Sequence, residues 1–176
     1  LEAYGETTVN YNRDIEIYPV VAAMFEGIYG HCPYKSPTDM GVNMAGNCII
    51  DDNICQEASR QEIIRRYYQS LNRFVRDEAS RDEVYKQELI MKQAKIAVND
   101  RSVVPVANNL AAENGSAAAA LELSDGTIVT GSTSDLLGPA SAVLLNAIKV
   151  LGHIDKKVHL ISRTFIEPIQ QLKTGY

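Results

Sequence analysis

The residues best suited to bind a ligand lie in a polar segment from Ser36 to Met44. Hydroxyl, carboxylate and amide side chains occur there beside a glycine, and a polar loop of this kind can form the wall of a ligand pocket. The candidate ligand-binding residues in this segment are Ser36, Thr38, Asp39 and Asn43. The alternative is a turn whose side chains satisfy their own backbone.

A second candidate site lies between Thr130 and Asp135, where we expect a strand to pass into a helix through small hydroxyl residues. Free backbone N–H groups at a helix start attract phosphate or carboxylate groups. The candidate residues here are Ser132, Thr133 and Ser134. Asp135 would repel an anion, and N-capping of the helix by Ser134 or Asp135 explains the same residue types.

Metal chemistry has no recognisable motif in this chain. None of the three histidines is followed by glutamate, so a His-Glu-x-x-His zinc motif is absent. Cys48 and Cys55 could bind a metal or form a disulfide, but buried apolar thiols are the simpler interpretation. The sequence also contains no P-loop, Rossmann fingerprint or nucleophile elbow. We therefore expect no metal and leave any other cofactor unknown.

Composition narrows the class of protein further. The 176 residues include 17 Lys and Arg against 22 Asp and Glu, and the resulting net charge of −5 argues against nucleic acid as a partner. Three cysteines at irregular spacing favour a reducing compartment, and hence the cytoplasm, over a disulfide-rich secreted domain. No apolar run has the roughly 20 residues that a membrane helix needs. Because the chain begins at Leu1 without a Met, we expect it to be an excised piece of a longer protein.

The first hundred residues are predicted to form a mainly helical subdomain, residues 1–100. Apolar residues at helical spacing predict a core-facing helix over 12–29, in which Pro19 causes a kink or a fresh start. Proline, glycine and small polar residues predict an ordered loop over 31–47. A clear apolar stripe predicts a helix from about Ile54 to Arg76, and Ser80 with Glu83 forms a capping box for a helix to about Ile96.

The rest of the chain is predicted to form a small α/β subdomain, residues 101–176. A short helix ends at Asn114-Gly115, and two apolar runs around Asp125-Gly126 predict a β-hairpin. A helix to Leu151, a strand over 158–161 and a last helix from about Thr164 should follow. The fold class is thus α/β: a helical subdomain followed by a small layered unit. A hairpin followed by a helix suggests a deaminase-like topology, but the residues of the deaminase zinc site are missing.

Several segments together resemble the bacterial family called domain of unknown function 1846. They are LEAYGETTVNYNRD at 1–14, SPTDMGVNM at 36–44, EASRQEIIRRYY at 57–68, Ala118–Leu123, Asp125-Gly126, Thr130-Gly131, Leu136–Gly138 and Glu167–Ile169. The resemblance implies a cytoplasmic protein without an established activity. It also implies a longer protein, whose N-terminal part contains a glycine-rich, phosphate-loop-like segment, and a C-terminal subdomain of deaminase-like topology.

Two functions are consistent with these features. In the first, the segment 36–44 contributes to a pocket that the missing N-terminal part completes, in an enzyme that binds a small phosphorylated or nucleotide-type ligand. In the second, the chain is a non-enzymatic structural or oligomerisation module, whose tyrosine-rich helix from Ile63 to Val75 packs against a partner chain, including a second copy. Neither nucleic acid nor a membrane is expected as a partner.

Overall fold

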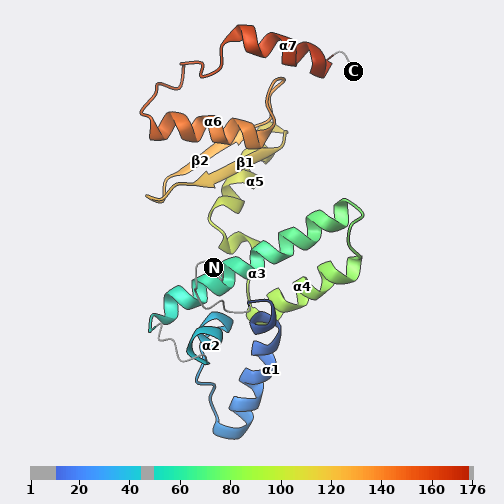
Figure 1. The fold of residues 1–176 in the computed structure, drawn as a ribbon, viewed down its shortest axis with the longest axis vertical. Helices are drawn as coiled ribbons and strands as arrows, with labels where there is room; N and C mark the ends of the chain where they lie inside the picture. The colour runs from blue at the N-terminus through green and yellow to red at the C-terminus, as the bar shows by residue number, and fades with distance from the viewer. Residues whose placement is uncertain (1–10, 45–49, 175–176) are drawn as a thin grey trace, which may run out of the picture. The chain divides into compact units, whose positions relative to one another are not determined.

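The computed structural model describes residues 11–44 and 50–174. The chain divides into two compact units, residues 1–98 and 99–176, and we describe each unit by itself. Within the described ranges, seven α-helices and one two-stranded antiparallel sheet are present (Figure 1). The fold is therefore mostly helical and consistent with the α/β class. None of the described helices combines the length and apolar character that crossing a bilayer requires.

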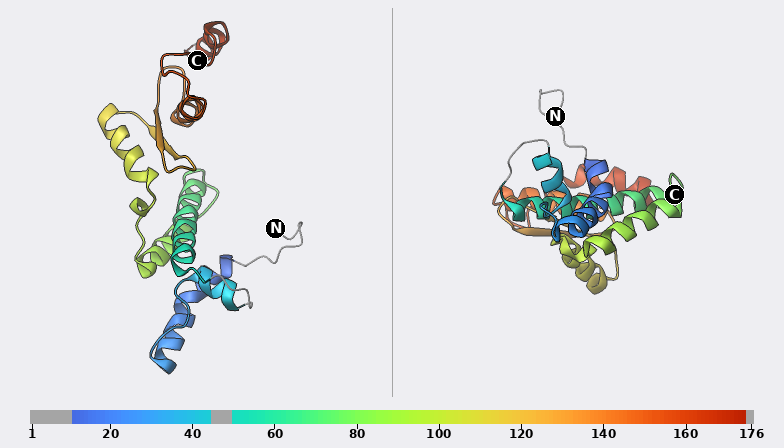
Figure 2. Two further views of the ribbon diagram at one scale, coloured as in Figure 1. Left: turned by 90° about the vertical axis from the view of Figure 1, so that its left-hand side faces the viewer. Right: turned by 90° about the horizontal axis from the view of Figure 1, so that it is seen from below.

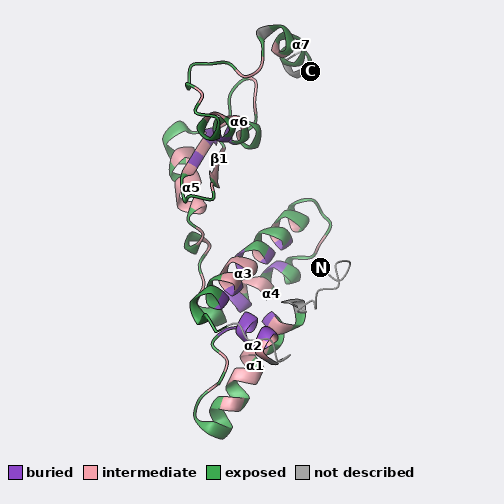
Figure 3. Ribbon diagram, turned by 60° about the vertical axis from the view of Figure 1, so that its left-hand side comes forward, coloured by how far each residue is buried: buried purple, intermediate pink, exposed green. Residues whose placement is uncertain are grey.

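The first unit contains four helices. They are α1 (Tyr11–Tyr29), α2 (Pro37–Met44), α3 (Asp52–Val75) and α4 (Arg81–Ala94). Helix α3 confirms the predicted long helix, and it begins where Asp51 accepts hydrogen bonds from the backbone N–H groups of Asn53 and Ile54. Its apolar stripe packs with α1 and α4 around a buried cluster of Ile15, Ile63, Ile90 and Met91 (Figure 3).

Helix α1 continues through Pro19 as a single helix, although we had expected a kink or a fresh start there. Only its first part faces the core. Ile15 is buried, whereas Val20, Met24 and Ile28 remain 61%, 59% and 68% exposed. The expectation that the whole apolar stripe is core-facing is therefore wrong for the later turns of α1.

The prediction of a loop over residues 31–47 is wrong for its central part, because residues 37–44 form helix α2. Ser36 caps this helix: its Oγ accepts a hydrogen bond from the backbone N–H of Asp39 at 3.1 Å. Pro37 follows at the first helical position, where a missing N–H costs nothing. Residues 45–47 lie outside the described part of the chain.

Helix α4 starts after Ser80, as predicted, but the capping box does not form. The Ser80 side chain makes no capping hydrogen bond in the described structure. The Glu83 carboxylate instead accepts a hydrogen bond from Arg73 Nη1 at 2.8 Å and so connects α4 to α3. Lys95 ends the helix in a left-handed conformation, with φ 56° and ψ 42°.

The second unit begins with α5 (Val103–Asn114), which Gly115 terminates at φ 63°. The predicted hairpin follows: β1 (Ala118–Glu122) pairs with β2 (Ile128–Ser132), with Ala120 opposite Thr130. Gly126 occupies the turn at φ 83°, a conformation that favours glycine. The predicted hairpin around Asp125-Gly126 is therefore confirmed.

Helix α6 (Pro139–Leu151) covers one face of the hairpin and α5 covers the other (Figure 2). Val129, Val143 and Ala147 form the buried centre of the α6 side. Gly131 permits this close packing, because a Cβ atom there would lie 2.3 Å from the backbone nitrogen of Val143. The second unit is thus layered around two strands.

The last part of the second unit differs from the prediction in one element. The expected strand over 158–161 is absent: Asp155 starts a turn in which its Oδ1 accepts from the N–H of Lys157, and no ladder partner is present within the described residues. A strand needs such a partner to satisfy its backbone groups. Helix α7 (Arg163–Thr174) confirms the last helix and contains Pro168 in its second turn.

Candidate functional site

A buried group of polar side chains fixes the start of α2 against α3. The Ser59 hydroxyl donates to the carbonyl of Cys55 at 3.0 Å. Because Ser59 has only one hydroxyl proton, Thr38 is the donor in the contact of 2.7 Å between the two hydroxyl oxygens. The backbone N–H of Thr38 also donates to Ser59 Oγ, at 3.1 Å. Thr38 therefore acts as an anchor between two helices.

The Asp39 carboxylate is the second anchor. Its Oδ2 accepts a hydrogen bond from the backbone N–H of Lys35 at 2.7 Å, and its Oδ1 accepts from the Asn43 amide. Asp39 is only 4% exposed, so these bonds satisfy a charge that water does not reach. The structure therefore brings Ser36, Thr38, Asp39 and Asn43 together and gives each of them a partner inside the fold. Their role in ligand binding stays a prediction.

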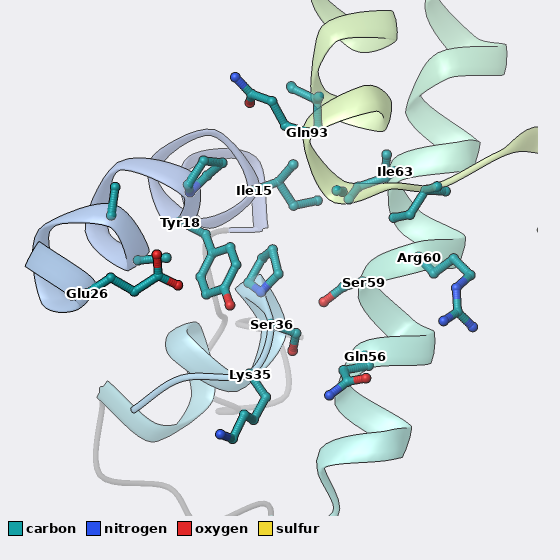
Figure 4. Close-up of a pocket in the computed structure, with 17 residues that line it drawn as sticks. Ile15, Tyr18, Glu26, Lys35, Ser36, Gln56, Ser59, Arg60, Ile63 and Gln93 are labelled. Carbon is teal, nitrogen blue, oxygen red and sulfur yellow. The ribbon is translucent and has the colours of Figure 1, made fainter. Parts of the chain in front are cut away.

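A pocket of about 480 Å³ lies beside this group, within the first unit (Figure 4). Its lining combines apolar residues with several polar side chains. The polar side chains are Tyr18, Glu26, Lys35, Ser36, Gln56, Ser59, Arg60 and Gln93. Of the four candidates in segment 36–44, only Ser36 reaches this lining. The other polar residues of the lining could not be selected from the sequence, because they come from four separate segments. Only Lys35 adjoins the polar segment 36–44.

The pocket has a polar end and an apolar end. Lys35, Ser36 and Gln56 lie at the polar end, whereas Ile15, Ile63 and Gln93 lie at the other (Figure 4). The described residues offer the Lys35 ammonium no ion-pair partner. Arg60, by contrast, pairs with Glu57 on its own helix. Lys35 is therefore the cation best placed to meet an anionic ligand.

Tyr18 stands between these two ends. Its hydroxyl donates a hydrogen bond to the carbonyl of Tyr34 at 3.0 Å. Burial raises the pKa of Tyr18 above its ordinary value, and the negative charges of Cys32, Asp39 and Glu26 raise it further. The phenol consequently stays neutral near neutral pH and keeps its donor.

The second predicted group, in residues 132–134, does not lie at a helix start. Ser132 ends β2, and Thr133 donates to the carbonyl of Ala117 through its N–H and its hydroxyl, at 2.9 and 3.0 Å. Ser134 closes a turn with Leu137, and Gly138 is the N-cap of α6. The expected capping by Ser134 or Asp135 is therefore wrong, because Pro139 starts the helix one turn later. These three residues also belong to a different unit from the pocket.

The cysteines are free thiols where the structure describes them. Cys55 is buried, and burial raises the pKa of its thiol, with smaller contributions from the charges of Asp39, Asp52 and Asp51. Cys32 is half-buried, and Cys48 lies outside the described residues. Over the described ranges, no three His, Cys, Asp or Glu side chains form a group that could hold a metal ion.

Known proteins match the chain from end to end. A family model described as domain of unknown function DUF1846, N-terminal, matches residues 1–95, and the corresponding C-terminal model matches residues 99–176. UPF0371 proteins of Streptococcus uberis and Streptococcus thermophilus are 52% and 54% identical to it over all 176 residues, and one of Corynebacterium urealyticum is 47% identical. The chain spans 36%, 36% and 35% of the lengths of these curated relatives.

Proposed function

The chain belongs to the bacterial DUF1846 (UPF0371) family, and from this premise we propose that its helical unit binds a small phosphorylated or nucleotide-type ligand as part of an enzyme. The pocket between α1, the start of α2, α3 and the end of α4 holds the ligand. Of the residues predicted from the sequence, Ser36 contacts the ligand, and Thr38, Asp39 and Asn43 hold α2 in place. The second set of predicted ligand-binding residues lies in the other unit and consists of Ser132, Thr133 and Ser134.

The observation that carries this proposal is the Lys35 ammonium at the polar end of the pocket. Ser36 and Gln56 place a hydroxyl and an amide at this end, and the exposed Lys35 side chain extends outward from the rim of the pocket, away from both of them (Figure 4). Such groups are suited to phosphate oxygens, because an ammonium adds a charge-assisted hydrogen bond and the neutral donors add direction. Glu26 also lines the pocket, and its charge disfavours a ligand that fills the whole space with anionic groups.

In this proposal, the chain acts together with the missing N-terminal part of the same, longer protein. The relatives are almost three times as long as this chain, so further segments of the protein can complete or close the pocket. The order α5, β1, β2 and α6 supports a deaminase-like topology for the second unit, without the zinc site of that fold. The sparse cysteines support a cytoplasmic location.

Replacing the pocket lysine tests the proposal. Calorimetry measures the affinity of the full-length protein that contains this chain for inorganic phosphate, ribose 5-phosphate and adenosine monophosphate. We expect Lys35→Met, which keeps the length of the side chain but removes its charge, to weaken binding of the phosphorylated ligands about tenfold or more. Lys92→Met on the exposed surface of α4 is the matched control and should leave binding unchanged. Failure of all three probes to bind, or equal binding by Lys35→Met, would contradict the proposal.

The non-enzymatic alternative, an oligomerisation module, has less support from the helix on which it was based. Ile63 and Ile64 of α3 are buried within their own unit, and Tyr67 packs against the same core. Tyr68 and Val75 remain exposed, which leaves a small apolar surface for a partner chain. Light scattering over a range of concentrations distinguishes the two functions, because the alternative requires a concentration-dependent increase in mass.

A further inference from the structure

We propose that the ligand of this pocket is a nucleotide, whose base stacks on the Tyr18 ring and whose phosphate lies at Lys35. This inference rests on the proposed function and decides between the two ligand classes that it allows, sugar phosphates and nucleotides. It depends on three features: a fixed aromatic ring, an apolar end and the separation of that end from the cation.

The Tyr18 ring is fixed at both of its ends. Its Cα belongs to α1, and its hydroxyl is tied to the carbonyl of Tyr34, sixteen residues further along the chain. The ring is half-buried and forms part of the pocket lining. A ring that is already immobilised loses little conformational entropy on binding, and stacking on an aromatic side chain stabilises a bound base.

The apolar end of the pocket suits a base better than a sugar. Ile15, Ile63 and Ile90 belong to the core behind it and are at most 9% exposed. The accessible apolar surface of the pocket comes from half-buried lining residues such as Pro19, Ala22 and Ile96. A sugar placed there would leave buried hydroxyl groups without hydrogen-bond partners, which disfavours its binding. A planar base instead buries its faces against carbon. The amide of Gln93, at the same end, offers one donor side and one acceptor side to the edge of such a base.

The separation of the two ends matches a ligand with an apolar part and an anionic part. Figure 4 shows Tyr18 between the isoleucine end and the Lys35 end. The Lys35 side chain is exposed and points outward in this view, so its ammonium would turn toward the pocket to meet the phosphate of a base on the ring. The volume of about 480 Å³ lies within the range of small-ligand pockets, roughly 300–1,000 Å³, and far exceeds the needs of a phosphate ion. Glu26 also adjoins Tyr18 in the lining and can accept hydrogen bonds from ribose hydroxyls.

Adenosine monophosphate and ribose 5-phosphate provide the direct test, because they share the sugar and the phosphate and differ in the base. We expect the unmodified chain to bind adenosine monophosphate about tenfold or more tightly than ribose 5-phosphate. Tyr18→Leu should remove most of that preference. Tyr18→Phe, which keeps the ring and loses only the hydroxyl, should retain most of it.

The outcomes separate this inference from the function on which it rests. If both ligands bind equally and both depend on Lys35, the nucleotide assignment is wrong and the phosphate site stands. If neither binds, the proposed function fails as well. The comparison of the two ligands on the unmodified chain needs no substitution, so a Tyr18→Leu variant that does not fold leaves the test intact. Chemical-shift changes of the Tyr18 ring protons, larger with adenosine monophosphate than with ribose 5-phosphate, give a second readout on the same chain.

Discussion

The Thr38 and Ser59 hydroxyl oxygens lie 2.7 Å apart, although the two residues are separated by 21 positions in the sequence. This buried contact joins the short helix α2 to the long helix α3, next to the pocket. Ser59 takes part in both the contact between the helices and the pocket, because its Oγ accepts hydrogen bonds from Thr38 and the residue also lines the pocket. One hydroxyl group of α3 therefore helps to position α2, together with the bond between Asp39 and the backbone of Lys35.

Ser59→Ala should destabilise the helical unit by about 1–3 kcal/mol, because the Thr38 N–H and hydroxyl lose their buried acceptor. Urea unfolding followed by circular dichroism measures this change as a lower midpoint. Ser141→Ala, at an exposed position of α6, is the matched control and should change stability by less than about 0.5 kcal/mol. Equal midpoints for the two variants would show that the Thr38–Ser59 contact contributes nothing to stability.

Gly131→Ala should disrupt the packing of α6 on the hairpin. An added Cβ would lie 2.3 Å from the Val143 nitrogen and 2.7 Å from the Ala142 carbonyl carbon, and both belong to a helix backbone that has no alternative rotamer. Overpacking of this kind costs about 1–3 kcal/mol or more. Thermal unfolding of the whole chain should show an earlier transition for the second unit.

The control for that substitution is Gly138→Ala. An added Cβ at Gly138 meets nothing within 4 Å, and its φ of −68° suits any residue. Because alanine is a poorer N-cap than glycine, we expect a loss of less than about 1 kcal/mol. A Gly131→Ala variant as stable as Gly138→Ala would mean that β2 and α6 are not packed as closely as the structure has them.

Strong local signals allowed the sequence to predict α3, α5 and the hairpin. The stripe that includes Ile63 and Ile64 continues at helical spacing to Val75, over more than three turns, which favours a helix over a strand. Gly115 and Gly126 both have positive φ, which few other residues adopt readily. Where a residue type and a backbone conformation are linked in this way, the sequence determines the element.

The structure differs from the prediction where contacts between distant segments, or a helix cap, determine the local conformation. The glycine and small polar side chains of residues 36–44 are typical of a loop, yet Ser36 followed by Pro37 is typical of a helix start, and the helix forms. The strand predicted over 158–161 has the right residue types but no partner strand in the described chain. The pocket was not predictable, because Tyr18, Lys35, Gln56 and Gln93 meet only after four segments have packed.

Lys95→Gly should stabilise the helical unit by about 1 kcal/mol. Lys95 holds φ at 56° after the last turn of α4, a conformation that costs an ordinary L-residue about 1–2 kcal/mol and glycine much less. The gain is reduced by the greater freedom of glycine in the unfolded chain. Lys92→Gly provides the matched contrast within α4, where glycine should destabilise by about 1 kcal/mol. Urea midpoints that shift in the same direction for both variants would contradict this explanation.

Glu62→Gln should remove a part of the stability that depends on pH. The hydrogen bond from Arg65 lowers the pKa of Glu62 below its ordinary value of 4.5, and Arg66 lowers it further against the opposing effect of burial. A carboxyl whose pKa is lower in the folded state stabilises the fold above 4.5, and that stabilisation is lost as the pH falls through the folded-state pKa. The variant should therefore be less stable than the unmodified chain at about pH 7, and the difference should shrink as the pH falls below 4.5.

Asp14→Asn should show the opposite pH dependence. Its Oδ2 is buried and has no hydrogen-bond partner among the described residues, and burial raises the pKa of this carboxyl above 3.8. A carboxyl whose pKa is higher in the folded state destabilises the fold increasingly as the pH rises from 3.8 through the folded-state pKa, because the ionised form is penalised by burial. The amide cannot ionise, so Asp14→Asn should be more stable than the unmodified chain at about pH 7, with the difference disappearing at about pH 3. Urea midpoints at the two pH values test both variants together: stability differences of the same sign for Glu62→Gln and Asp14→Asn at about pH 7 would show that one of the two carboxyl groups is not in the environment described.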